Sequence, residues 1–172
     1  NTFVEWQIVG NERAINDETF KRGTENTTIT SIWEANEHTL TIDPNGGEWD
    51  GNASPSELSI NYDSVTPIAD PERSGYTFTG WTVSNGTYSG GNFTLDYDGD
   101  VTLTANWIIN RYKYLVYHKK QSTDGSTYDE VPGDTISGNE NYGVTITPIV
   151  NNYLGFTPPS QESLTIDVDT DP

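Results

Sequence analysis

An aromatic pattern occurs twice in this chain, and it constrains the fold more than any other feature. Each copy begins with a Phe-x-x-Trp pair and ends with a strand-like segment that closes on a second tryptophan. The first copy is Phe3, Trp6 and Asn26-Thr-Thr-Ile-Thr-Ser-Ile-Trp33, and the second is Phe78, Trp81 and Asp100-Val-Thr-Leu-Thr-Ala-Asn-Trp107. A repeat distance of about 75 residues indicates a modular array rather than one enzyme core.

The two copies differ in what precedes them. Residues 38–75 stand before the aromatic pair of the second copy, and no such segment stands before the first. We therefore expect residues 1–37 to be the C-terminal half of a truncated, degenerate repeat and residues 38–108 to be a complete repeat. Residues 109–172 follow a different pattern and form a third module. The chain is expected to be a piece of a longer polypeptide.

Composition excludes several classes of function. Cysteine is absent, which removes thiol catalysis, cysteine zinc sites and disulfides. With 26 acidic and 8 basic residues, the net charge of −18 repels nucleic acid. No apolar run reaches the roughly 18 residues of a membrane span, so we expect no membrane insertion. An acidic chain rich in Asn, Thr and Gly is typical of an exported protein.

Apolar residues alternate along most of the chain, which predicts strands and little helix. Val101, Leu103, Ala105 and Trp107 are separated by polar residues, the pattern of a strand with one face on a core. The alternation changes phase at Gly80, where a bulge would return Trp81 to the core. We therefore expect a mainly β or α+β chain of small tandem modules.

Three ordered segments of residues 38–107 resemble the Listeria–Bacteroides repeat, the B repeat of internalin-type bacterial surface proteins. They are Leu40-Thr-Ile-Asp-Pro-Asn-Gly-Gly47, Pro71-Glu-Arg-Ser-Gly-Tyr-Thr-Phe-Thr-Gly-Trp81 and Val101-Thr-Leu-Thr-Ala-Asn-Trp107. The first copy departs from this pattern, with Glu5 in the place of Gly80 and Ser31 in the place of Ala105. The resemblance implies a β-grasp-like, ubiquitin-type fold: a small mixed sheet wrapped on a short helix or turn.

Residues 112–168 resemble the mucin-binding-protein repeats that often follow B repeats. The matching elements are Tyr112-x-Tyr-x-Val116, the Asp124-Gly125 turn and Gly155-Phe156. Both families occur in surface adhesins of Gram-positive bacteria, as stalk or binding modules. The resemblance therefore implies an extracellular location on the bacterial cell surface, by cell-wall anchoring or secretion.

Asp96, Asp98 and Asp100 are the candidate calcium ligands. Calcium loops use closely spaced oxygen ligands around a glycine, but the EF-hand order is absent here. A hairpin turn at Asp98-Gly99 explains the same residues. Asp167, Asp169 and Asp171 make a weaker case. The two histidines, His38 and His118, lie in different modules without the spacing of a catalytic triad, and we expect no cofactor.

The aromatic residues divide into two groups. Repeat-equivalent positions are expected to pack as structural anchors, namely Phe3, Trp6, Trp33, Phe78, Gly80, Trp81 and Trp107. Other aromatic residues could form a stacking platform for sugars or peptides, or could pack in strands and loops. These candidates are Trp49, Tyr128, Tyr142 and Tyr153.

The sequence thus predicts a non-enzymatic fragment of a bacterial cell-surface adhesin that serves as a stalk or spacer array. Its partners would be neighbouring repeats of the parent protein and possible host glycoproteins, mucins or glycans. One alternative is a glycan- or mucin-binding module that acts through exposed aromatic residues. Another is an accessory domain of a secreted enzyme.

Overall fold

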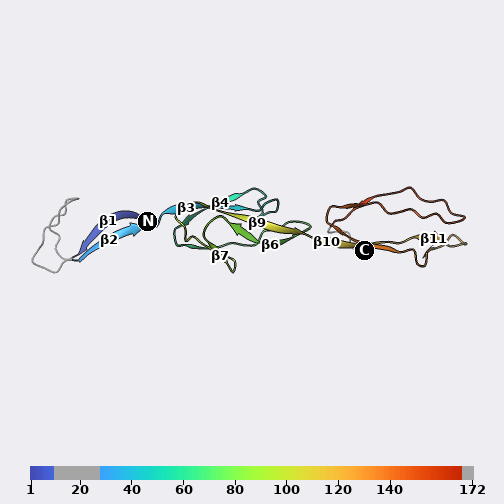
Figure 1. Cartoon of the computed structure of the whole chain (residues 1–172), viewed down its shortest axis with the longest axis horizontal. Helices are drawn as coiled ribbons and strands as arrows, with labels where there is room; N and C mark the ends of the chain where they lie inside the picture. Colours follow the sequence, from blue (N-terminus) through green and yellow to red (C-terminus); the bar gives the residue numbers. More distant parts are fainter. Residues whose placement is uncertain (10–27, 168–172) are drawn as a thin grey trace, which may run out of the picture. The chain divides into compact units, whose positions relative to one another are not determined.

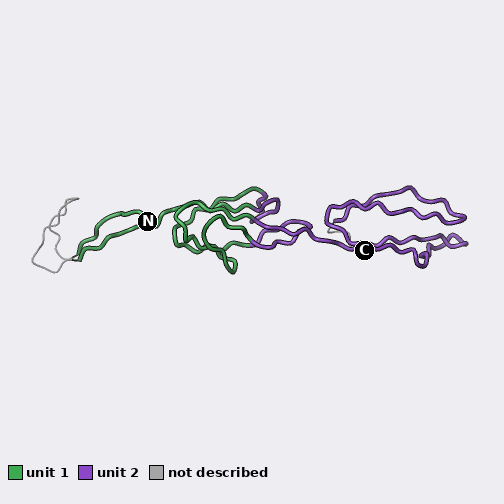
Figure 2. The backbone as a smooth tube through the Cα atoms, in the orientation of Figure 1, with its two compact units in different colours: residues 1–43, 54–69, 81–104 green, residues 44–53, 70–80, 105–172 purple. Residues whose placement is uncertain are grey.

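A computed structural model describes residues 1–9 and 28–167 of the chain (Figure 1). The described residues form strands and turns without a helix, which confirms the mainly β prediction. They divide into two compact units, residues 1–43, 54–69 and 81–104 in one and residues 44–53, 70–80 and 105–172 in the other (Figure 2). Asp169 and Asp171 lie outside the described residues.

The first aromatic copy is a two-stranded antiparallel ribbon. It pairs β1 (Thr2–Val9) with β2 (Thr28–Glu34), and Phe3 stands opposite Trp33. The register shifts between Phe3 and Glu5, which marks a bulge in β1. Two strands alone are marginally stable in water.

The second copy belongs to a four-stranded mixed sheet in the order β4-β3-β9-β6. Its strands are β3 (Glu37–Asp43), β4 (Ser56–Asn61), β6 (Tyr76–Val83) and β9 (Val101–Ile109). β3 runs antiparallel to β4 and parallel to β9, with Leu40 opposite Val101. A parallel pair needs a long connection, and residues between β3 and β9 supply it.

A three-stranded sheet in the order β5-β8-β7 belongs to the same compact unit as β3 and β4. It consists of β5 (Val65–Pro67), β7 (Thr87–Ser89) and β8 (Asn92–Thr94). The core of this unit contains side chains with no exposed surface, namely Leu40, Ile42, Phe93, Leu95 and Leu103. The alternating residues Val101, Leu103 and Ala105 of β9 are therefore buried, as a half-buried strand requires.

Gly80 interrupts the alternation of β6. Its φ of 129° is open to glycine but rarely to other residues. Tyr76 and Phe78 are half-buried and alternate with exposed threonines, whereas Gly80 and Trp81 are both half-buried. The change of phase lies where the sequence predicts it, and it keeps Trp81 on the less exposed side.

The remaining strands belong to residues 111–165 and pair in twos. They are β10 (Arg111–Val116) with β13 (Ile136–Asn141), β11 (Lys119–Gln121) with β12 (Tyr128–Glu130), and β14 (Thr145–Ile146) with β15 (Leu164–Thr165). Ile166 is the one apolar side chain classed as buried among described residues 108–167. This segment therefore has little core. The candidate site is a cavity beside β11 and β12 of this segment.

Candidate ligand-binding site

A cavity of about 540 Å³ lies next to β11 in the C-terminal segment. Its lining comes from β11 and the residues before it, from Tyr128 of β12, and from the loops that follow β14. The lining residues are 116–121, 128, 148–151, 153, 156–160 and 162. Its volume falls within the range of small-molecule sites.

His118 holds one wall of this cavity through both ring nitrogens. Nδ1 lies 2.9 Å from the carbonyl oxygen of Asp134, and Nε2 lies 3.1 Å from that of Ile149. A carbonyl oxygen only accepts, so both nitrogens donate when both bonds are formed, as they do in the protonated ring. The bond to Asp134, then the bond to Ile149, raises the pKa of His118.

Asp134, whose carbonyl bonds His118, also holds Tyr153. The hydroxyl of Tyr153 donates to Oδ2 of Asp134 at 2.5 Å, and the ring centroid of Tyr153 lies 6.3 Å from that of His118. Loss of hydration, followed by the bond to Asp134, raises the pKa of Tyr153. Asp134 thus fixes both aromatic rings, one through its main chain and one through its carboxylate.

Lys120 places a positive charge over this aromatic wall. Its Nζ lies 4.1 Å from the centroid of Tyr153 and 5.9 Å from that of Phe156, both within cation–π range. Among the described residues Lys120 makes no ion pair within 4.0 Å. The cavity therefore combines an ammonium group with aromatic faces, including the 65% exposed ring of Tyr128.

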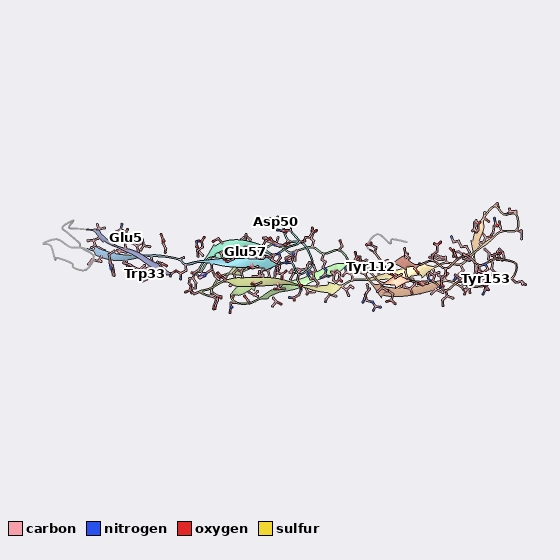
Figure 3. The ribbon with its side chains drawn as sticks, turned by 90° about the horizontal axis from the view of Figure 1, so that it is seen from above. Glu5, Trp33, Asp50, Glu57, Tyr112 and Tyr153 are labelled. Atoms are coloured by element: carbon pink, nitrogen blue, oxygen red, sulfur yellow. The ribbon has the colours of Figure 1, made fainter. Side chains whose placement is uncertain are left out.

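The structure brings together two of the four predicted ligand-binding aromatics and separates the others. Tyr128 and Tyr153 line the cavity; Figure 3 labels Tyr153. Tyr142 packs instead against Tyr76, with ring centroids 6.2 Å apart, and covers Gly75. Trp49 begins a tight turn in which its main-chain N–H and C=O both bond Asn52 at 2.9 Å. Neither Tyr142 nor Trp49 lines the cavity.

Sequence reasoning missed Lys120, Phe156 and Asp134 as members of this wall. Lys119 and Lys120 are adjacent in a chain with only 8 basic residues, and that was the available signal. Asp134 offered no signal, because one acidic residue among 26 is not distinctive.

The three predicted calcium ligands bond different protein groups. Asp96 accepts from Thr87, and Asp100 accepts from the main-chain N–H of Thr39, each at 2.8 Å. Asp98 accepts from Asn36 at 3.0 Å and lies 2.8 Å from Nε2 of His38. Within residues 1–9 and 28–167, no three His, Cys, Asp or Glu side chains are grouped to hold a metal ion.

Two anchors of the second copy, Phe78 and Trp107, line a separate groove. Phe78 and Trp107 lie edge to face, with ring centroids 5.6 Å apart. The guanidinium of Arg73 stacks 3.8 Å from the ring of Tyr76 and lies 6.0 Å from that of Trp107. These residues line a groove of about 580 Å³ together with residues 46–48, 53, 71, 72 and 74.

A turn of residues 44–47 closes over Trp107. The Nε1–H of Trp107 donates to the carbonyl of Pro44 at 3.0 Å, and Asn45 donates to the carbonyl of Ala105 at 2.9 Å. Positive φ values at Asn45 and Gly46 make this an Asn-Gly turn of the hairpin type. A Cβ on Gly47 would lie 2.5 Å from the Trp107 ring, so only glycine permits this approach.

The first copy contains the same kind of anchors on its ribbon. Phe3 lies edge to face with Trp33 at 5.4 Å and tilted to Trp6 at 5.6 Å. Trp6 and Trp33 are nevertheless 59% and 57% exposed. Figure 3 labels Glu5 and Trp33 on this ribbon.

The described part of the chain forms strands and turns, and it has no helix long and apolar enough to cross a membrane. Two relatives from Evansella cellulosilytica align with the chain. One, named "Putative Gly-rich membrane protein", is 34% identical over 109 residues, which are 62% of this chain and 12% of the relative. The other, named "Putative membrane protein", is 32% identical over 126 residues, 72% of this chain and 17% of the relative.

The chain therefore spans less than a fifth of the length of either relative. No solved structure matches it significantly. Residues 38–106 match the Listeria-Bacteroides repeat domain, and they include both the Asn-Gly turn and the Phe78–Trp107 pair. This segment of the chain, residues 38–106, is a Listeria-Bacteroides repeat domain.

Proposed function

We propose that this chain is a non-enzymatic segment of a bacterial cell-surface adhesin, in which tandem modules form an extracellular stalk. The observation that carries the proposal is the repeated edge-to-face Phe–Trp pair, at 5.4 Å in one copy and 5.6 Å in the other. A structural unit that recurs along a chain supplies spacing and presentation. The module boundaries proposed are 1–37, 38–108 and 109–172.

The order of the four-stranded sheet supports a β-grasp-like fold for residues 38–108. The first and last strands of this module, β3 and β9, are parallel neighbours at the centre of the sheet. β4 and β6 flank them. In place of the short helix that a ubiquitin-type fold would carry, the described connection between β4 and β6 contains turns and the short strand β5.

The names of the two Evansella relatives support a location in the cell envelope. Both are named as membrane proteins, and the chain corresponds to a small part of each. An extracellular repeat array attached to a larger envelope protein is consistent with the acidic composition.

Segment replacement in the parent protein tests the stalk proposal. One variant carries a Gly/Ser linker of 172 residues in place of this chain, and another carries unrelated folded β modules of similar total length. A stalk predicts that the folded replacement retains adhesion of the bacteria to host cells and that the flexible linker reduces it. Loss of adhesion with both replacements would indicate that this chain itself binds the host ligand.

A second candidate function is recognition of a glycan or mucin in the cavity beside β11. The supporting observation is the convergence of Tyr128, Tyr153 and Phe156 with the ammonium group of Lys120. Aromatic faces stack on sugar rings, and Lys120, which makes no ion pair with the residues that the structure describes, can receive an acidic substituent. Trp49 remains a separate proposal for the same function.

Binding of the purified chain to mucin and to a glycan array tests this candidate. Tyr128→Ala should reduce binding at least about tenfold, as loss of a central aromatic contact does. Tyr97→Ala is the matched control, because Tyr97 is 45% exposed and lies in the other compact unit. Equal binding by both variants, or no binding by the wild type, removes the candidate.

A further inference from the structure

The ribbon of β1 and β2 presents one apolar face that the described residues leave exposed. We call it the aromatic face and define it as Phe3, Trp6, Ile8, Ile29 and Trp33. Cross-strand pairing places these side chains together, since Phe3 is opposite Trp33 and Ile8 is opposite Ile29. Phe3, Trp6, Ile29 and Trp33 are 41%, 59%, 45% and 57% exposed. A contiguous apolar surface of this kind is typical of an interaction site.

The equivalent positions of the second copy show what covers such a face. Leu103, which corresponds to Ile29, has no exposed surface, and Ala105, which corresponds to Ser31, has none either. Trp107, which corresponds to Trp33, lies under the turn of residues 44–47 and donates to the carbonyl of Pro44. The turn and the strand before it belong to residues 38–75, and none of the described residues takes their place on the ribbon of β1 and β2.

The two copies also differ in whether the edges of their closing strands, β2 and β9, are paired. β9 has a neighbour on each side, with β3 parallel to it along residues 101–104. Within the described residues β2 pairs with β1 alone, so its second edge presents unpaired main-chain groups. An open edge beside an exposed apolar face is a template for an added strand.

We propose that the aromatic face and the open edge of β2 are a docking surface for a polypeptide segment like residues 38–75. A strand like β3 would add parallel to β2 at residues 28–30, which correspond to residues 102–104 of β9. Its apolar side chains would cover Ile29, and an Asn-Gly-Gly turn would close over Trp33. This rests on the proposed array and deepens it by naming the kind of segment that the aromatic face accepts.

The fit requires particular chemistry from the incoming segment. Its glycine at the position of Gly47 must approach the tryptophan ring without a Cβ, which would lie 2.5 Å from that ring in the second copy. Its turn must offer a carbonyl to the indole N–H, as Pro44 does at 3.0 Å. Any peptide carries main-chain carbonyls, so the first requirement is the selective one: a peptide without glycine at that place fails it, whereas a segment with the Asp-Pro-Asn-Gly-Gly sequence meets both.

An extended chain tests the proposal. A second copy of residues 38–75 is placed directly before Asn1 of the full chain, which reproduces the order of the second repeat. Amide hydrogen exchange of residues 28–34 is then compared with that of the original chain. We expect exchange to slow by at least about 100-fold, because β2 gains a hydrogen-bonded neighbour and its apolar face becomes covered.

Two variants of the added segment make the result specific. Valine at the added counterpart of Gly47 should abolish the protection, since its side chain collides with Trp33. Asparagine at the added counterpart of Gly51 should leave it, because no atom lies within 4 Å of that Cβ position and asparagine tolerates positive φ.

Unchanged exchange in the extended chain would overturn the proposal, and so would protection that survives the valine variant. A dimeric original chain in sedimentation, with β2 already protected, would also overturn it in favour of a second copy as the occupant. The measurement uses purified protein, so its failure leaves the stalk proposal and its cell-adhesion test untouched.

Discussion

The two aromatic copies share local geometry and differ in burial. Phe3 and Trp33 meet edge to face at 5.4 Å and 74°, and Phe78 and Trp107 meet at 5.6 Å and 64°. The ribbon alone therefore suffices to set the ring pair. Burial does not follow from the pair, because Ile29 is 45% exposed where Leu103 is fully buried. Residues far away in the sequence provide that burial.

The irregularities of β1 and β6 differ between the two copies in their need for glycine. β1 shifts register between Phe3 and Glu5, and β6 changes phase at Gly80, the residue equivalent to Glu5. Gly80 uses a φ of 129°, whereas the described non-glycine residues with positive φ do not include Glu5. Both copies thus have an irregularity within the Phe-x-x-Trp segment, but only the one in β6 depends on glycine.

The largest expected difference between the copies is in their core residues. Leu103→Ala should lower the free energy of unfolding by about 2–5 kcal/mol, because it opens a cavity in a packed core. Ile29→Ala should cost less than about 1 kcal/mol, because the side chain is 45% exposed. Urea unfolding monitored by circular dichroism measures both. Equal costs would show that the aromatic face is already covered in solution.

A smaller effect is expected at the turn over Trp107. Gly47→Ala should cost about 1–3 kcal/mol, because its Cβ would meet both the Trp107 ring and the carbonyl oxygen of Glu72. Thermal unfolding of this variant is compared with that of Gly51→Asn, whose side chain enters open space. A neutral Gly47→Ala would mean that the turn does not press on the ring.

Removal of the indole N–H should lower stability more at Trp107 than at Trp33. Trp107→Phe removes the bond to the carbonyl of Pro44 and should cost about 1 kcal/mol more than Trp33→Phe. Trp33 makes no hydrogen bond through its indole within the described residues and is 57% exposed. Denaturant midpoints of the two variants provide the comparison. A larger loss from Trp33→Phe would contradict it.

The smallest expected effect is on pH dependence. Hydrogen bonds from Asn36 and then from His38 lower the pKa of Asp98 below its usual 3.8. The folded state therefore gains stability above that value and loses it as pH falls through the lower, folded pKa. Asp98→Asn should flatten the fall in Tm as the pH drops below about 4. Thr2 also bonds Asn36 at 3.0 Å, so this cluster joins the ribbon's first strand to the start of the repeat domain.

Acid titration of Asp124 provides the control for this last comparison. Hydrogen bonds from Ser122 and Ser126 lower the pKa of Asp124 to about 2, but this turn lies outside both aromatic copies. Asp124→Asn should therefore flatten the acid loss of stability of the compact unit that contains residues 105–172 between about pH 5 and pH 2, and it should leave the pH dependence of the unit that contains Asp98 unchanged. A change in the unit that contains Asp98 as large as that of Asp98→Asn would show that the effect is not specific to the junction.

Much of the repeat domain could be predicted from the sequence. Alternation located β9 and buried Leu103 and Ala105, because a half-buried strand needs period two. The Asn45-Gly46 pair located a turn, because both positions need positive φ. The phase change located the irregularity at Gly80.

The cavity beside β11 was less predictable. Tyr128 and Tyr153 were candidates, but so were Trp49 and Tyr142, which lie elsewhere. Aromatic identity cannot say which rings converge, because convergence depends on loops such as residues 148–160. Nothing local distinguishes Asp134, which orients His118 and Tyr153 from another part of the segment.

By itself the sequence determined the repeat, the strands and the residues able to anchor them, since these depend on local pattern and on backbone preference. The tertiary structure alone decided that the same Phe–Trp pair is covered in one copy and open in the other. The reason is that burial comes from contacts between distant segments: Trp107 lies under residues 44–47, and Trp33 has no counterpart of them among the described residues.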